Sequence, residues 1–123
     1  MYAIYVKSTR SIRYAIALVQ GYKVMETRTR NVLKSLIGKR VAVIETGRGK
    51  SMIVGYINID KYEYIEKEQF DKMYMFHCVP AGSKYDCKKG SGKYCYWVSN
   101  PIPCEPYPVP ENAVKHGRSW CEF

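Results

Sequence analysis

A hairpin pattern in the middle of the sequence most constrains the fold. Residues 39–46 contain four β-branched side chains, and residues 51–59 follow after the turn Gly47-Arg48-Gly49-Lys50. β-branched side chains pack well on a pleated surface, and a short glycine-containing turn joins two antiparallel strands. The segment therefore predicts a β-hairpin on which the rest of a sheet can assemble.

Other segments show the short alternating pattern of strands, in which successive side chains point to opposite faces. They are residues 2–7, 22–27, 94–99 and 119–123, with 74–79 as a further candidate. The last of the four is expected to close the sheet. Residues 100–110 contain five prolines and must be extended or turning. Residues 81–93 are rich in glycine and lysine, which predicts an exposed, mobile loop.

One amphipathic helix is expected after the first strand, with Ser8 or Ser11 as its cap and Gly21 as its end. Weaker helical patterns occur in residues 31–37, which Gly38 would close, and within residues 60–74. The apolar stripe of the first helix consists of Ile12, Ala15, Ile16 and Val19.

These elements predict an α+β fold. About six strands with one or two packed helices fit a small, partly closed β-barrel. The chain has 123 residues, of which 46% are hydrophobic, so it can bury a core without disulfides. It contains no internal repeats, and residues 1–123 are expected to form a single domain.

The sequence also argues against a membrane-spanning or secreted protein. No apolar run approaches the ~18 residues that a membrane span needs. Residues 1–6 alternate as a strand does, unlike the charged and then apolar start of a signal peptide. We therefore expect a cytoplasmic protein without membrane association.

Cysteine usage favours reduced, packed thiols. Five cysteines cannot all pair within one chain, and none belongs to a C-x-x-C motif. His77 and His116 lack zinc-finger spacing, and no serine–histidine–carboxylate constellation accompanies them. The sequence predicts neither a metal nor a cofactor.

The positive charge is concentrated in the first third of the chain. The net charge is +9, and residues 1–40 contain nine basic residues with one acidic residue, Glu26. A localised positive surface attracts polyanions and speeds their association. The distribution therefore favours RNA or DNA as a partner over a merely solubilising surface.

The segment from Gly21 to Arg28 carries the most chemistry, because it interleaves charged residues with the apolar residues of an expected strand. Alternation places Glu26 and Arg28 on one face of that strand. Lys23 would face the other way unless a bulge or the Gly21 turn brings it round. If all three converge, a carboxylate lies between two cations. The alternative is a buried ion pair that only fixes the end of the barrel.

This motif, G-x-K-x-x-E-x-R at Gly21, Lys23, Glu26 and Arg28, resembles that of the ASCH domain family of the PUA-like superfamily. Further similarities are the strand after Gly38 and the segments 53–57 and 96–101, which together span most of the chain. The resemblance implies a PUA-like barrel with the motif residues in a groove. It also implies an RNA-binding or nucleotide-binding module.

On this basis we expect Lys23, Glu26 and Arg28 to bind the ligand. Other basic residues would provide the surrounding electrostatic field and contact RNA: Arg10, Arg13, Arg30, Lys39 and Arg40. Sequence alone does not identify the RNA or base, the protein partners or the oligomeric state.

An enzyme is the first alternative. Some ASCH proteins resemble this chain at G-x-K and are small nucleoside amidohydrolases of the acetylcytidine type, and others are ribonucleases. Lys23 would then be the activating base and Glu26 a catalytic residue. The amidohydrolases carry threonine where this chain has Glu26, and the adjacent Thr27 faces the opposite side of an ideal strand. Their remote catalytic glutamate has three possible counterparts here: Glu45, Glu63 and Glu66.

A protein-interaction domain is the second alternative, with the proline-rich residues 100–110 contacting the partner. Two other basic segments are weaker candidates for phosphate or base contacts. Arg48 and Lys50 lie on the glycine turn, and the lysine run 84–93 lies beside Tyr85 and Tyr94. We expect the lysine run to be a solvated loop.

Overall fold

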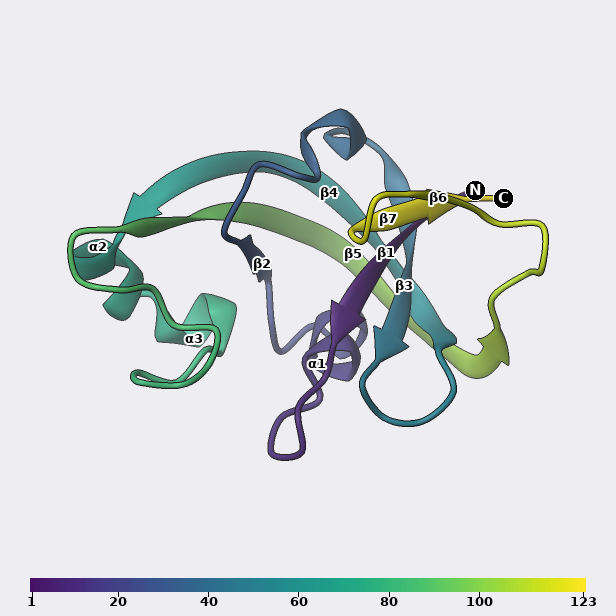
Figure 1. Ribbon diagram of the computed structural model, residues 1–123, viewed down its shortest axis with the longest axis horizontal. Helices are drawn as coiled ribbons and strands as arrows, with labels where there is room; N and C mark the ends of the chain where they lie inside the picture. Colours follow the sequence, from purple (N-terminus) through teal and green to yellow (C-terminus); the bar gives the residue numbers. More distant parts are fainter.

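The expected hairpin is the centre of the structure. In the computed structural model, which describes residues 1–123, β3 (Arg40–Thr46) pairs antiparallel with β4 (Met52–Glu66). The strand after it in the chain, β5 (Gly92–Pro108), pairs with β4 along most of its length. These long strands form the curved central part of the sheet in Figure 1.

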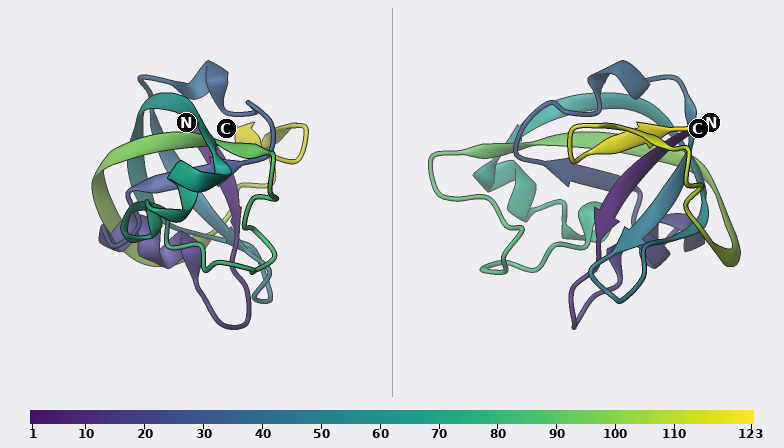
Figure 2. Two further views of the ribbon diagram at one scale, coloured as in Figure 1. Left: turned by 90° about the vertical axis from the view of Figure 1, so that its left-hand side faces the viewer. Right: turned by 45° about the vertical axis from the view of Figure 1, so that its right-hand side comes forward.

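Four shorter strands complete a seven-stranded sheet in the order β2-β5-β4-β3-β1-β7-β6. Only the β1–β3 pair is parallel, and every other pair is antiparallel. The sheet curls around its interior without closing, as the side views show (Figure 2). The short strands are β1 (Tyr2–Lys7), β2 (Met25–Arg28), β6 (Val114–His116) and β7 (Trp120–Glu122).

The opening of the barrel lies between β1 and β2. β7 pairs only with the first half of β1, from Tyr2 to Ile4. The second half, residues 5–7, therefore has no strand on that side and lies beside β2 (Figure 1). We call this opening, bounded by residues 5–7 and 25–28, the seam.

Three short helices accompany the sheet: α1 (Tyr14–Gln20), α2 (Lys67–Asp71) and α3 (Tyr74–His77). α1 is the predicted amphipathic helix, and Gly21 ends it in the left-handed conformation with φ 87°. Its cap was predicted wrongly. Arg13 occupies that position without a side-chain cap, and the Ser8 hydroxyl donates to Glu45 instead.

Two segments between residues 60 and 79 differ from expectation. Residues 60–66 continue β4, so the helix predicted within 60–74 begins only at Lys67. Residues 74–77 form α3 and not a strand. A 3₁₀ turn, η1 (Lys34–Leu36), lies within the weakly helical segment 31–37.

The proline-rich residues 101–108 belong to β5. They pair with β4 through register shifts, while β2 covers β5 only from Tyr94 to Trp97. Residues 101–108 therefore have a neighbouring strand on one side only. Proline, which cannot donate to a ladder, is tolerated where one side of a strand is unpaired.

The loop 81–91 is not uniformly exposed. Cys87 is buried, and the Asp86 carboxylate accepts hydrogen bonds from the backbone N–H groups of Gly82 and Cys87. Lys67 of α2 donates to the same carboxylate at 2.9 Å. These contacts fix the loop to α2, which the glycine and lysine content did not indicate.

The core consists of a main cluster of 21 buried residues and a second cluster of five. All five cysteines are free, and Cys87, Cys95 and Cys121 are buried. None of the helices combines the length and the apolar character needed to cross a bilayer.

Candidate functional site

The seam contains a cleft of about 340 Å³. Its 14 lining residues come from β1, β2, α1, the ends of β3 and β5, and the loops beside them. They include three tyrosines and a single acidic residue, Glu26. The cleft is strongly positive, because five basic residues line it: Lys7, Lys23, Arg28, Lys93 and Arg118.

The turn after α1 places Lys23 in the cleft. β2 begins only at Met25, so strand alternation does not apply to Lys23. Its backbone N–H donates to the Ala17 carbonyl at the end of α1. The side chain is 1% exposed, with Nζ 5.2 Å from the Tyr14 ring centroid and 3.7 Å from Glu26 Oε1. Lys23 thus lies on the same side as Glu26 and Arg28.

Arg28 connects Glu26 to the opposite side of the seam. Its Nε and Nη2 donate to Glu26 Oε2 at 3.1 and 2.8 Å. Nη2 also donates to the carbonyl oxygen of Tyr5 in β1 at 2.7 Å. A side chain therefore joins β1 to β2 where a backbone ladder would close the barrel. Arg28 Nη1 donates to no protein acceptor and is free for a ligand.

Burial controls the charge of Lys23. Loss of hydration lowers its pKa, and the Arg28 guanidinium lowers it further, whereas the Glu26 carboxylate raises it. Burial is the largest of these effects. A lysine with a lowered pKa loses its proton more readily and can then act as a base.

The hydrogen-bond acceptor of Lys23 is the backbone carbonyl of His77, and the contacts of the His77 ring hold this carbonyl in place. Its ring stacks on Phe70 with centroids 3.9 Å apart, donates through Nε2 to the Phe70 carbonyl and accepts from Val79 N–H at Nδ1. Its own carbonyl accepts the hydrogen bond from Lys23 Nζ. Burial, with a smaller effect from Lys23, lowers the pKa of His77. No sequence pattern indicated this role, which depends on backbone groups of α2 and α3.

The basic residues expected to surround the motif lie outside the cleft. Arg13 binds Glu45 through two hydrogen bonds, at 2.5 and 3.1 Å. Arg40 donates to Asn58 and to the Asn100 carbonyl, and Lys39 lies over the Tyr2 ring. Arg10 is exposed. Arg30 lines a neighbouring hollow.

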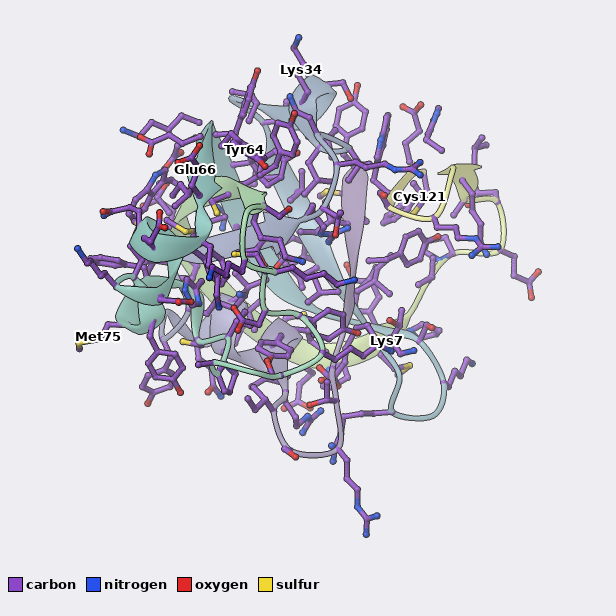
Figure 3. The ribbon with its side chains drawn as sticks, turned by 60° about the vertical axis from the view of Figure 1, so that its left-hand side comes forward. Lys7, Lys34, Tyr64, Glu66, Met75 and Cys121 are labelled. Atoms are coloured by element: carbon purple, nitrogen blue, oxygen red, sulfur yellow. The ribbon has the colours of Figure 1, made fainter.

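Three cleft cations were not predicted to lie beside the motif: Lys7, Arg118 and Lys93, the last of which belonged only to a weaker candidate segment. Lys7 ends β1 (Figure 3), Lys93 begins β5, and Arg118 lies on the turn between β6 and β7. Lys93 was assigned to a solvated loop, yet it is 8% exposed and donates to the Thr29 hydroxyl. Only the curvature of the sheet brings these distant residues to the seam. By contrast, Lys34 projects outward in Figure 3.

The cleft offers little for the catalytic arrangement of the amidohydrolase alternative. Glu45 is held by Arg13 and Ser8 and does not line the cleft. Glu63 and Glu66 are exposed on β4. Glu26 is therefore the only carboxylate in the lining. No group of three or more histidine, cysteine or acidic side chains is placed to hold a metal ion.

The open, mostly antiparallel sheet with short helices is a small α+β fold. Comparisons of the sequence with protein-family models and with curated proteins give no match. The structure, however, superimposes on the crystal structure of ASCH from Zymomonas mobilis with a TM-score of 0.65 and 15% identity, covering 87% of this chain and 73% of that chain.

Two mutant forms of the Zymomonas mobilis protein give similar values. One has a TM-score of 0.67 and 18% identity, covering 86% of this chain and 73% of the other. The second has a TM-score of 0.64 and 16% identity, with coverages of 87% and 76%. Because the sequence identities are below 20%, the structural similarity establishes an ASCH-like fold and nothing about activity.

Proposed function

We propose that this ASCH-like module binds RNA or a nucleotide-like ligand in the seam cleft. The observation that carries the proposal is the composition of the lining, in which five cations accompany one carboxylate around about 340 Å³. Phosphate is the anion that such a set of lysines and arginines recognises most readily.

The motif residues provide contacts of different kinds. Arg28 Nη1 can donate to a phosphate or to a base carbonyl. Glu26 Oε1 accepts no hydrogen bond within the protein and can accept one from an exocyclic amine, as carboxylates do with cytosine. Tyr5, Tyr14 and Tyr85 supply aromatic surface, on which bases stack.

The size of the cleft favours a single nucleotide over a duplex. A volume of about 340 Å³ is at the lower end of small-molecule sites. One base with its sugar and phosphate is of that scale, whereas a double helix requires a broad surface. We therefore place one unpaired nucleotide in the cleft.

Catalysis by Lys23 is a second candidate, which the lowered pKa of this lysine favours. A buried amine beside a bound nucleotide is placed to accept a proton. Incubation of bound RNA, and separately of acetylcytidine, with the protein tests for turnover. An activity that Lys23→Met abolishes would support the enzyme.

The binding test uses a labelled structured RNA at about 50 and 200 mM salt. Four proteins are compared: wild type, Arg28→Ala, Glu26→Gln and Lys61→Ala. Lys61 is an exposed lysine on β4 that does not line the seam cleft, so it serves as the charge control. Thermal unfolding of each variant verifies its fold.

We expect Arg28→Ala to weaken binding about tenfold or more, because a charged hydrogen-bond donor is lost. Glu26→Gln should also change the affinity, whereas Lys61→Ala should stay within about twofold of wild type. Wild-type affinity in Arg28→Ala would refute the cleft. Absence of binding at either salt concentration would favour the protein-interaction alternative.

A further inference from the structure

A second hollow adjoins the cleft at the turn between β6 and β7. It has a volume of about 560 Å³ and shares Arg28, Thr29 and Arg118 with the cleft. The two spaces therefore meet along a common wall. Arg30 and His116 line the far part of the second hollow, which contains no acidic residue.

Two of the basic side chains of this hollow are unpaired within the protein. The guanidinium groups of Arg30 and Arg118 form no hydrogen bond or salt bridge, and both residues are exposed, whereas Arg28 and His116 are paired with Glu26 and Glu122. Arginine side chains that no carboxylate of the protein binds are available for anions such as phosphate. Val32 is the only apolar side chain in the lining, which disfavours an apolar protein partner.

The turn that carries Arg118 is fixed to the sheet. The Ser119 carbonyl accepts a hydrogen bond from the Tyr5 N–H of β1 at 3.0 Å. His116 stacks on Trp120 with centroids 4.0 Å apart, and its Nε2 lies 3.1 Å from Glu122. Gly117 adopts φ 68°, a conformation that suits glycine in a tight turn. The turn that carries Arg118 is therefore held by β1 and β7, and it forms part of the wall between the cleft and the second hollow.

We propose that the second hollow is a phosphate subsite for the same ligand, which is then a single-stranded RNA of two or more nucleotides. The inference rests on the proposed function. One nucleotide occupies the cleft, the strand crosses between Arg28 and Arg118, and its next phosphate lies against Arg30. A free nucleotide would leave the second hollow empty.

The test compares two probes, cytidine 5′-monophosphate and a single-stranded oligocytidylate of about six nucleotides. Each is titrated into wild type, Arg28→Ala, Arg30→Ala and Arg10→Ala. Arg10 is the matched control, because it is also an exposed arginine without a partner and lines neither space.

We expect wild type to bind the oligocytidylate about tenfold or more tightly than the mononucleotide. Arg30→Ala should remove most of this difference, lower the salt slope for the oligocytidylate by about one, and leave mononucleotide affinity unchanged. Arg10→Ala should behave as wild type does with both probes.

The outcomes separate the two proposals. Equal affinities of wild type for the two probes, or equal effects of Arg30→Ala and Arg10→Ala, would overturn the second subsite. Mononucleotide binding that Arg28→Ala abolishes would still support the cleft in that case. Failure of both probes to bind would overturn both proposals.

Discussion

Glu26 balances the charges of the cleft at the scale of single residues. Its carboxylate lies between Lys23 and Arg28, and the three side chains are 8%, 1% and 17% exposed. Removing one partner of a buried charged group leaves the others uncompensated. Glu26→Gln should therefore lower the free energy of unfolding as well as change the affinity for the ligand. Thermal unfolding of the variant separates these two effects.

The lowered pKa of Lys23 predicts a pH-dependent stability. Because its pKa is lower in the folded than in the unfolded protein, the unfolded chain binds more protons between the two values. The free energy of unfolding therefore rises with pH in that window, reaches its full value above the unfolded pKa of 10.5 and falls as pH drops through the folded pKa.

Urea unfolding of wild type and Lys23→Met at a series of pH values up to about 10 measures this effect. We expect wild type to gain stability relative to Lys23→Met, by about 1.4 kcal/mol for each pH unit inside the window. Taking the difference between the two proteins cancels the titration of the tyrosines. A difference that stays constant over the series would show that Lys23 has an ordinary pKa.

At the scale of elements, Gly55 allows α1 to pack against β4. A Cβ atom at this position would lie 2.4 Å from the Ile102 carbonyl oxygen and 2.7 Å from Val19 of α1. The first neighbour is backbone of β5 and cannot move alone. Since α1 leads directly into the turn that carries Lys23, its position also determines the cleft.

Gly55→Ala should therefore lower the free energy of unfolding by about 3 kcal/mol, the upper range for overpacking. Gly49→Ala is the control, because a Cβ there meets no atom within 4 Å. Its φ of 79° alone should cost about 1 kcal/mol. Chemical denaturation of both variants measures the two losses, and equal losses would mean that crowding at Gly55 is absent.

The sequence predicted those elements whose determinants are local. The β3–β4 hairpin, the helix ended by Gly21 and the last strand, β7, follow from β-branched residues, turn residues and alternation, although β7 does not close the sheet as expected. The continuation of β4 to Glu66 was missed, because tertiary pairing with β5 overrides the weak local preference for a helix. Residues 74–77 were expected as a strand and form α3. In the cleft, the motif was found as a contiguous pattern, whereas Lys93 and Arg118 required the curvature of the whole sheet.

At the scale of the whole molecule, the proposed ligand site is a consequence of incomplete barrel closure. β7 is too short to cover β1, so residues 5–7 face β2 across the seam, with Arg28 as the connecting side chain. The hairpin β6–β7 lies beside β1 near both termini (Figure 1). One wall of the proposed site therefore comes from β1 with the β6–β7 turn and the other from β2.

Hydrogen exchange tests this arrangement across the entire chain. In the free protein we expect β3 and β4 to exchange slowest, because they are central, and the edge strands β2 and β6 to exchange fastest among the strands. Addition of the oligocytidylate should slow exchange on both sides of the seam at once, in peptides covering residues 25–32 and 114–119. Peptides from residues 60–66 should remain unchanged, and Arg28→Ala should lose the effect at both walls. Protection confined to one wall would mean that the ligand binds an outer surface and that the seam is only a structural opening.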